Sequence, residues 1–496
     1  MTARRRTLAV ATLGVAFMAL AAAVAGLGDL RVHNREYVAL QGGMVAVCGL
    51  AALLLWRRAR RRDVVLLLVV ALAARALLAF DVPTLSDDAY RFVWDGRVQA
   101  EGINPYRHTP AGQGVRHLRD WEVFTEVNRP YTRTVYPPAD QLAFRAAHAV
   151  AGDGVVRVKL FLLAVEAAVV ALLLVLLART GRSPGRVALY VWHPLAVVEI
   201  ASSGHLEPLL LALTLAALLL WDARRRVSAG AALGAAALTK FVPLVLAPFL
   251  LRRGGWRLAA AAAVTGLLLY LPYAGAGALV LGSVGSYADE QFGAGLFRWL
   301  TYVGLPESPV RVLLLAGLAS GVLWSALRPP SDLAGACRYA ALLLGGALLA
   351  SHNVQPWYLL WVLPFLCVAP FSGLLWATAT VSLFYLVMKP HRVVDPDVVS
   401  LVVWAPALAL LAGAAIRSSF LRPAWAWAGA RVQEPAGEQA PAAAARGRAE
   451  MERARAEKGQ LPSRAASSGA SSRPPACAPS EPTFAESSSA SSDPSA

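Results

Sequence analysis

Residues 155–178 read VVRVKLFLLAVEAAVVALLLVLLA, an almost unbroken apolar run. An α-helix that crosses a bilayer needs roughly 17 to 25 predominantly apolar residues, and this run meets that requirement. Comparable runs stand at 7–27, 36–56, 64–80, 257–279, 308–327 and 398–416. Several further runs are shorter or broken by proline. The sequence therefore predicts an all-α polytopic membrane protein that contains short broken helices as well as full spans.

Composition assigns the whole chain to the same class. The 496 residues are 57% hydrophobic and 16% charged, with a formal net charge of +16. A soluble chain of this composition would carry more apolar surface than one core could bury. The basic residues recur between apolar runs and do not follow one face of a soluble module, so they indicate membrane topology and not a nucleic-acid interface.

The basic clusters orient the predicted spans, because loops rich in Lys and Arg stay in the cytoplasm. These clusters lie at 4–6, 57–62, 179–186, 224–226 and 252–257. The opposite, extracytoplasmic side would then hold the segments around 81–150, 201–206, 240, 280–307, 352–356 and 389–397. Counting half-length helices, about fourteen crossings result, with both termini in the cytoplasm.

The two ends of the chain are less informative. The stretch after Arg4–Arg6 also resembles a signal peptide, but no small-residue cleavage site leads into a soluble domain, and we interpret it as the first span. Residues 1–432 are predicted as one transmembrane domain, with 81–154 as its first large extracytoplasmic loop. Residues 433–496, rich in Ala, Ser, Pro, Glu and Arg, are predicted to form a disordered cytoplasmic tail.

An acidic pair opens the large loop, where residues 86–97 read SDDAYRFVWDGR. The serine can cap a helix that begins near Asp87, and on that helix Asp88, Arg91 and Asp95 would share a face. This pattern is also typical of simple capping with solvated ion pairs. However, a neighbouring like charge and partial burial near the headgroups would raise one carboxyl pKa, which favours a general base for a sugar hydroxyl.

Aromatic residues are interspersed through the rest of the loop, among them Tyr136 in the turn Tyr136-Pro137-Pro138. Aromatic faces beside polar groups suit a sugar, but Trp and Tyr also collect at membrane interfaces for no catalytic reason, and both interpretations stay open here. The segment 138–150 mixes apolar residues with charged ones, which indicates an interfacial helix and not a span.

Three ionisable residues lie in segments that should be at membrane depth or at the outer turns. His205 and Glu207 stand at the apex between two basic clusters, and Lys240 stands at the tip of a short proline-interrupted hairpin. Such groups are costly in a bilayer and usually face a polar pathway. His205 and Glu207 could instead form a plain polar turn, and Lys240 could extend to the interface and not meet a lipid phosphate.

The predicted outer ends of later spans add further polar and aromatic groups, including His352, Gln355 and Trp357, and then Lys389, His391 and Arg392. His205, Glu207 and His352 could bind a divalent ion, yet no tight ligand motif such as H-E-x-x-H is present. We therefore predict neither a metal site nor another cofactor. The four cysteines, Cys48, Cys337, Cys367 and Cys477, predict neither a disulfide nor a metal site.

Taken in order, these motifs resemble the C-type (GT-C) glycosyltransferases and, within them, the bacterial polyprenol-phosphate-mannose-dependent mannosyltransferases. The motifs that carry the resemblance are SDDAYRFVWDGR (86–97), NPY (104–106), YPP (136–138), SGHLE (203–207), LTKF (238–241) and QPWY (355–358). The resemblance implies that Asp87 is the base with Asp88 beside it, that Lys240 and Arg91 neutralise the donor phosphate, and that His205 and Glu207 orient donor or acceptor.

We further expect Tyr136, His352, Gln355 and Trp357 to bind substrate. Two features depart from the commonest pattern of the family: two spans precede the one that leads into the acidic loop, and no folded outer domain follows the last span. The second departure removes a part that often selects acceptors, so the acceptor is not defined.

We therefore hypothesise that the chain is a membrane enzyme that transfers a hexose. The resemblance alone favours mannose as that hexose. The donor would be a polyprenyl-phosphate sugar, the acceptor an envelope glycan or lipid, and the reaction an inverting one on the extracytoplasmic face. No Gly-rich phosphate loop indicates a nucleotide-binding domain. A transporter or flippase of a lipid-linked or small substrate is the main alternative, since such proteins also use broken helices and buried charges; a structural partner in an envelope assembly would leave those charges unexplained.

Overall fold

The computed structural model describes residues 2–281, 283, 295–388 and 392–420, and these residues form helices and turns without a β-strand. The chain divides into two units, residues 1–420 and 421–496, and the described residues all belong to the first. The predicted tail at 433–496 lies outside the described residues, as do Cys477, Lys389 and His391.

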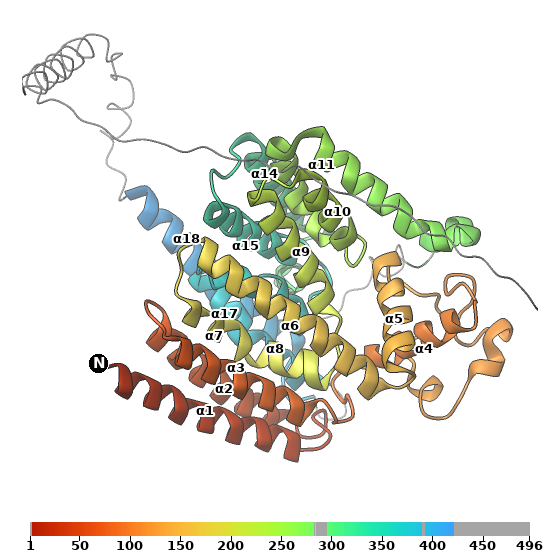
Figure 1. Cartoon of the computed structure of the whole chain (residues 1–496), viewed down its shortest axis with the longest axis horizontal. Coiled ribbons are helices and arrows are strands. Elements are labelled where there is room, and N and C mark those ends of the chain that lie inside the picture. The colour runs from red at the N-terminus through yellow and green to blue at the C-terminus, as the bar shows by residue number, and fades with distance from the viewer. Residues whose placement is uncertain (1, 282, 284–294, 389–391, 421–496) are drawn as a thin grey trace, which may run out of the picture. The chain divides into compact units, whose positions relative to one another are not determined.

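The first three helices are α1 (Ala3–Gly26), α2 (Asn34–Leu55) and α3 (Arg61–Leu78), which pack side by side (Figure 1). They join the rest of the bundle through large buried side chains; Phe17 of α1, for example, stacks on Trp192 with ring centroids 5.2 Å apart. Arg75 of α3 forms a bidentate ion pair with Glu166 at 2.6 and 2.7 Å and donates to the carbonyl of Val191 at 2.8 Å. These two buried charges are thus paired with each other, which lowers their cost in a membrane interior.

Seven helical stretches of the described chain are long and apolar enough to cross a membrane: Arg4–Gly26, Asn34–Leu55, Val155–Arg179, Val242–Leu281, Glu307–Leu327, Leu333–Ala350 and Pro396–Ile416. Six of them contain or nearly coincide with predicted spans. The predicted span 64–80 corresponds to α3, which carries four charged residues in its 18 and is not among the seven. Leu333–Ala350 was not among the predicted full-length runs. The total of about fourteen crossings stays a prediction.

The large loop folds as a separate layer beside the start of α6 (Val155–Arg179). Its elements are α4 (Asp88–Ala100), η1 (Gln113–Leu118), η2 (Phe124–Glu126) and α5 (Pro138–Ala151). Phe92 of α4 stacks on Phe144 of α5 at 4.6 Å, which forms a small apolar core between the two helices. The helix predicted at 138–150 is therefore present as α5, which with 14 residues is too short to span. Figure 1 shows α4 and α5 together at the start of α6.

The chain after α6 is broken into short pieces. They are η3 (Pro184–Val187), α7 (Ala188–Val191), α8 (Pro194–Val197), the π-helical turn η4 (Val198–Ser202) and α9 (Glu207–Asp222). Pro194 starts α8 because a proline without an N–H fits a first helical turn. Gly204 turns the chain toward α9 with a φ of +74°, which residues with a side chain rarely adopt.

The next described elements are α10 (Arg226–Ala237), η5 (Val242–Leu246), α11 (Ala247–Tyr270), η6 (Leu271–Leu281), α13 (Leu296–Tyr302), α14 (Glu307–Leu327) and α15 (Leu333–Ala350). The predicted hairpin around Lys240 is present between α10 and η5. The predicted run 257–279 is not one α-helix, because Pro272 cannot donate to the helical ladder and η6 takes over from Leu271.

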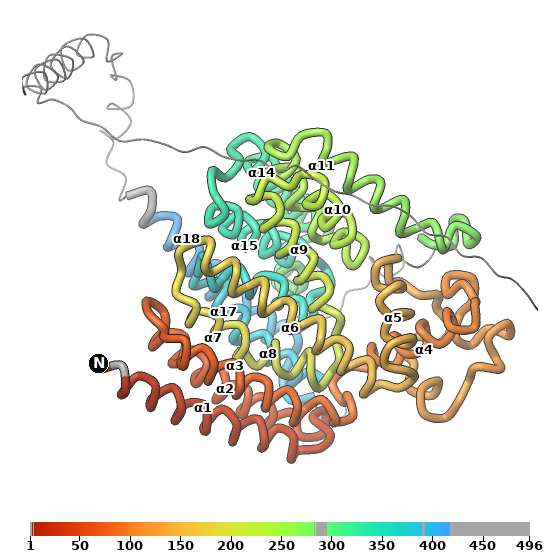
Figure 2. Tube along the Cα trace, viewed as in Figure 1, coloured from red at the N-terminus to blue at the C-terminus, as the bar shows by residue number. Residues whose placement is uncertain are grey.

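The last elements are η7 (Pro356–Trp361), α16 (Leu363–Leu366), α17 (Ser372–Thr380), η8 (Val381–Val387) and α18 (Pro396–Phe420). The tube in Figure 2 follows α6 from the α4–α5 layer back through the bundle. Basic clusters from different junctions meet: an Arg6 nitrogen lies 3.1 Å from the Arg58 carbonyl, and the Arg186 guanidinium covers the Trp56 ring at 4.1 Å.

Candidate functional site

A cavity of about 560 Å³ collects the polar motifs that the sequence singled out. Its walls come from α4, the loop 128–137, the turn 205–207, the hairpin tip 239–242, α14 and the segment 350–361. Nine of the ten predicted site residues line it: Asp88, Arg91, Tyr136, His205, Glu207, Lys240, His352, Gln355 and Trp357. The tenth, Asp87, does not. The structure thus brings these distant segments together around one cavity, and the side of the membrane on which it lies stays a prediction.

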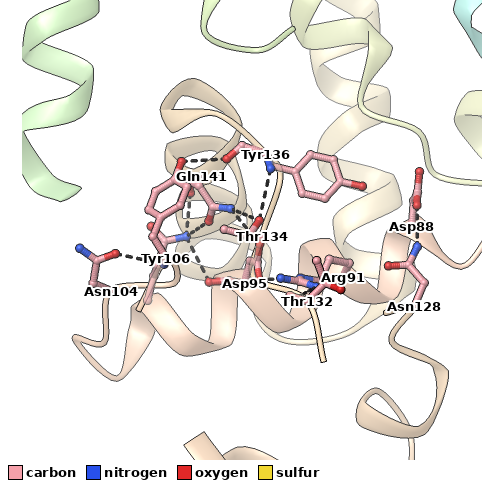
Figure 3. A network of polar contacts seen from close by, with 11 residues as sticks. Asp88, Arg91, Asp95, Asn104, Tyr106, Asn128, Thr132, Thr134, Tyr136 and Gln141 are labelled. Atoms are coloured by element: carbon pink, nitrogen blue, oxygen red, sulfur yellow. Dashed lines mark hydrogen bonds and ion pairs between the residues drawn. The ribbon is translucent and has the colours of Figure 1, made fainter. Parts of the chain in front are cut away.

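Asp88 is the carboxylate of the acidic pair that faces the cavity. Its backbone N–H donates to Ser86 Oγ at 3.3 Å, while the N-cap position of α4 is held by Asp87 and not by the predicted serine. Its side chain is 25% exposed, and its Oδ1 accepts a hydrogen bond from Asn128 Nδ2 at 2.7 Å (Figure 3). Asp88 is thus held by a neutral donor and keeps a second oxygen toward the cavity.

Asp87 precedes α4 and is not among the residues that line this space. Its side chain is 42% exposed and lies 3.9 Å from an Arg31 nitrogen. Partial burial raises the pKa of Asp87, the Arg31 charge opposes that rise, and the charges of Asp88 and Glu126 add to it. A raised pKa was the expected property of the base, but the position beside the cavity belongs to the neighbouring residue. The base role thus fits Asp88 better than Asp87, and both assignments await measurement.

Arg91 lies beneath Asp88 in a polar network that fixes the loop (Figure 3). Its Nε donates to Asp95 Oδ1 at 3.0 Å, and another guanidinium nitrogen donates to the Thr132 carbonyl at 3.2 Å. Asp95 also accepts from Gln141 Nε2 at 2.8 Å. The charge of Arg91 is therefore largely offset by Asp95, and its clearest task is to hold the 128–137 loop against α4.

Lys240 also has a partner, because its ammonium donates to Glu207 Oε1. The same ammonium lies 4.6 Å from the centroid of Tyr358 and 5.5 Å from that of Trp361, within the range of cation–π attraction. Lys240, the predicted phosphate ligand, and Glu207, a predicted substrate ligand, thus form one ion pair at the cavity wall. Lys240 is held at this depth by a carboxylate and two aromatic rings.

The remaining predicted ligands are fixed by aromatic contacts and local hydrogen bonds. His205 is 1% exposed and stacks on Trp357 with centroids 3.8 Å apart. Phe297 meets His352 edge to face at 4.0 Å, and Gln355 Nε2 donates to Asn353 Oδ1 at 2.9 Å. These rigid aromatic faces beside polar groups provide the mixed surface that a sugar ring requires.

Sequence reasoning missed several residues that line the cavity, chiefly the arginines Arg129, Arg133 and Arg311. The Nε of Arg133 is buried and has no hydrogen-bond partner within the described part of the chain. Arg129 and Arg133 flank an exposed tyrosine in a polar loop, which was an available signal. Arg311 lies on the apolar helix α14, and only the packing of that helix brings it here.

One rim of the cavity is apolar and exposed. Phe241 and Leu315 both line the cavity, and they are 41% and 48% exposed. Leu315 lies on α14, which is long and apolar enough to cross a membrane, and Phe241 directly precedes a second such stretch, Val242–Leu281.

Within the described ranges, no group of three or more His, Cys, Asp or Glu residues could hold a metal ion. Cys48, Cys337 and Cys367 are buried free thiols. The expectation that no metal or cofactor takes part stays a prediction.

A comparison with models of protein families matches residues 3–253 to the alpha-(1->6)-mannopyranosyltransferase family, N-terminal domain. The matched range contains the α4–α5 layer, the turn with His205 and the hairpin tip with Lys240. Searches of curated proteins and of solved structures each gave no match.

Proposed function

Because the chain belongs to the alpha-(1->6)-mannopyranosyltransferase family, we propose that it transfers mannose from a polyprenyl-phosphate donor to a glycan or lipid acceptor of the envelope. The transfer would take place on the extracytoplasmic face. Membership of this family favours a glycosyltransferase over the transporter or flippase that the sequence left open. The family name further suggests the primary 6-hydroxyl of a mannose unit as the acceptor group.

The observation that carries this proposal is the position of Asp88 in a cavity that is polar and basic on one side and apolar on another. In the proposed reaction, Asp88 takes the proton of the acceptor hydroxyl as that oxygen attacks the anomeric carbon. The bond from that carbon to the phosphate oxygen breaks, and its electron pair leaves with the phosphate. In-line attack would invert the anomeric centre, so a β-linked donor would yield an α-linked product.

The leaving phosphate gains charge and needs a nearby cation. Arg133 is the best placed of the lining arginines, since its Nε is buried without a described partner. Lys240 would add its charge if the phosphate competes with Glu207 for the ammonium. The sugar would stack on Trp357 or Tyr136, and the polyprenyl chain would leave past Phe241 and Leu315 into the bilayer.

The positions of the basic junctions support an extracytoplasmic cavity. The cavity is lined by none of the residues from the clusters at 4–6, 57–62, 179–186, 224–226 and 252–257. If these clusters stay in the cytoplasm, as Lys- and Arg-rich loops do, the cavity belongs to the opposite face.

The first experiment compares wild type, Asp88→Asn and Asp87→Asn in membranes at equal protein level. Radiolabelled polyprenyl-phosphate mannose is the donor, and a synthetic mannoside is the acceptor. We expect transfer by wild type, a loss of about 10²- to 10⁴-fold for Asp88→Asn, and less than about 10-fold for Asp87→Asn, because only the first removes the carboxylate that faces the cavity. An α-mannosidase should release the transferred label.

The matched acceptor control is the same mannoside without its 6-hydroxyl, which should receive no label. Undiminished transfer by Asp88→Asn would overturn its role as the base. Transfer by wild type from a nucleotide-linked mannose, and none from the lipid donor, would overturn the proposed donor.

A further inference from the structure

Glu199 is a wholly buried carboxylate directly behind the cavity, in the π-helical turn η4. Turns of this type are frequent at functional sites. Its Oε1 accepts a hydrogen bond from the hydroxyl of Tyr385 at 2.6 Å, and its Oε2 lies 3.3 Å from His205 Nδ1. The backbone carbonyl of Glu199 lies 3.1 Å from the same His205 nitrogen. The carboxylate is thus hydrogen-bonded to η8 through Oε1, while Oε2 lies beside the His205 ring and has no hydrogen-bond partner among the described residues.

These contacts determine which nitrogen of the His205 ring carries the hydrogen. Nδ1 faces two oxygen acceptors, so it must carry a hydrogen to make a favourable contact. In the neutral ring Nε2 then carries a lone pair and can only accept a hydrogen bond. Nε2 is buried, has no hydrogen-bond partner within the described chain, and lies 3.9 Å from Asp88 Oδ2. Two acceptors therefore face each other across a short gap, an arrangement that becomes favourable once a proton lies between them.

We infer that His205, oriented by Glu199, is the second proton acceptor of the transfer reaction, and that Glu199 is a positioning residue acting through it. The inference rests on the proposed function. The acceptor hydroxyl loses its proton to Asp88 as the new C–O bond forms; the proton then passes to His205 Nε2, and Asp88 returns to its charged state. The resulting imidazolium is balanced by the Glu199 carboxylate, and it later releases the proton to water.

The surroundings of His205 suit this role. Trp357 covers the ring and fixes its plane. Gly204 packs against Lys159 of α6, whose ammonium donates to the Asp81 carbonyl at 2.5 Å and is thereby directed away from the ring. The charged groups around His205 are thus Asp88 on α4, Glu199 on η4, Lys159 on α6 and Glu207 on α9, and the last is paired with Lys240.

A second layer of hydrogen bonds holds Glu199 in place. Asn34 Nδ2 donates to the Tyr385 carbonyl at 3.3 Å, and Ser382 Oγ donates to Gln41 Oε1 at 2.9 Å. These bonds tie α2 to η8 and so position the tyrosine that donates to Glu199.

The test measures kcat and donor KM against pH for wild type and Glu199→Gln, with labelled polyprenyl-phosphate mannose and the synthetic mannoside. Glutamine keeps the size of the side chain and leaves the backbone carbonyl facing Nδ1 but carries no charge, so the imidazolium loses its counter-charge. We expect kcat to fall about 10-fold or more, donor KM to change little, and the acid limb of the kcat profile to move to lower pH by about one unit or more. Glu199→Asp should keep the limb near its wild-type position.

Glu101→Gln, which changes an exposed carboxylate just after α4, is the matched control and should leave the profile unchanged. If Glu199→Gln does not fold, His205→Asn gives a second measurement, because Asn retains a donor near the Nδ1 position and removes the Nε2 acceptor. It should lower kcat and move the acid limb in the same direction.

A Glu199→Gln profile equal to wild type, or one lowered equally at every pH, would overturn the inference while the proposed function stands. Absence of transfer by wild type itself would instead reject the proposed function, and the inference with it.

Discussion

At the scale of single residues, Asp140 illustrates the electrostatics around the cavity. It lies in the first turn of α5, is wholly buried, and neither carboxylate oxygen has a hydrogen-bond partner among the described residues. Burial raises the pKa of Asp140 well above its ordinary value, nearby Glu207 adds to the rise, and Lys240 opposes it. The folded protein therefore keeps a proton on this carboxyl at pH values where the unfolded chain has lost it.

We predict that Asp140→Asn becomes progressively more stable, relative to wild type, as pH rises through the range between the ordinary carboxyl pKa of about 3.9 and the raised pKa of Asp140 in the folded protein. Across this window folded wild type binds more protons than unfolded wild type, so its free energy of unfolding falls with pH by up to about 1.4 kcal/mol per unit. Asparagine has no proton to lose. Melting temperatures in detergent at three pH values test this expectation.

Asp120→Asn is the control of opposite sign. Partial burial raises the pKa of Asp120. Hydrogen bonds from Arg97 and from two backbone N–H groups lower that pKa by more than burial raises it, so the net shift is downward. Its carboxylate stabilises the fold above its unfolded pKa, and that contribution is lost as pH falls through the folded value. A stability difference for Asp140→Asn that does not change with pH would contradict the assigned protonation.

At the scale of secondary-structure elements, the contact between α10 and α11 sets the position of the hairpin tip. A Cβ on Gly230 would lie 2.2 Å from the Leu258 carbonyl, and a Cβ on Gly234 would lie 2.5 Å from that of Ala262. The two glycines are four residues apart, the spacing that lets membrane helices approach closely. Beyond α10, the Leu238 carbonyl accepts from the Ala139 N–H at 3.0 Å and joins the hairpin to the α4–α5 layer.

We predict that Gly234→Ala lowers stability by about 1–3 kcal/mol and raises the donor KM, because the added methyl forces α10 away from α11 and displaces Lys240. Gly49→Ala is the matched control, since a Cβ there meets nothing within 4 Å and the gain in helix propensity is the same. Equal melting temperatures for the two variants would show that the close contact has little energetic weight.

Most elements follow from local sequence. The lengths of the apolar runs predicted six of the seven helices that could span, because spanning a bilayer requires only a continuous apolar stretch. Two predicted runs differ from the structure for local reasons: three charged residues begin α3, and Pro272 ends α11 within the predicted run 257–279. The π-helical turn at Glu199 had no signal beyond one ionisable residue in an apolar segment.

At the scale of the whole molecule, the orientation in the membrane decides where the reaction can occur. Trp121 in the large loop is 85% exposed, and Ala223 is exposed beside the basic cluster at 224–226. With Cys477 replaced by serine, the other three cysteines are buried. We predict that a membrane-impermeant maleimide labels Trp121→Cys in intact cells but labels Ala223→Cys only after permeabilisation. The reverse result would place the cavity in the cytoplasm.

The sequence by itself determined the membrane class, most of the spans and nine of the residues that line the cavity. Charged and polar residues in apolar surroundings are costly wherever the chain folds, so His205, Glu207 and Lys240 were recognisable as unusual. Only the tertiary structure showed that Asp88 lines the cavity and Asp87 does not, because adjacent residues at a helix start point about 100° apart. It also brought Arg311 to the cavity and Glu199 behind His205. Such convergence depends on how distant helices pack, which no local pattern encodes.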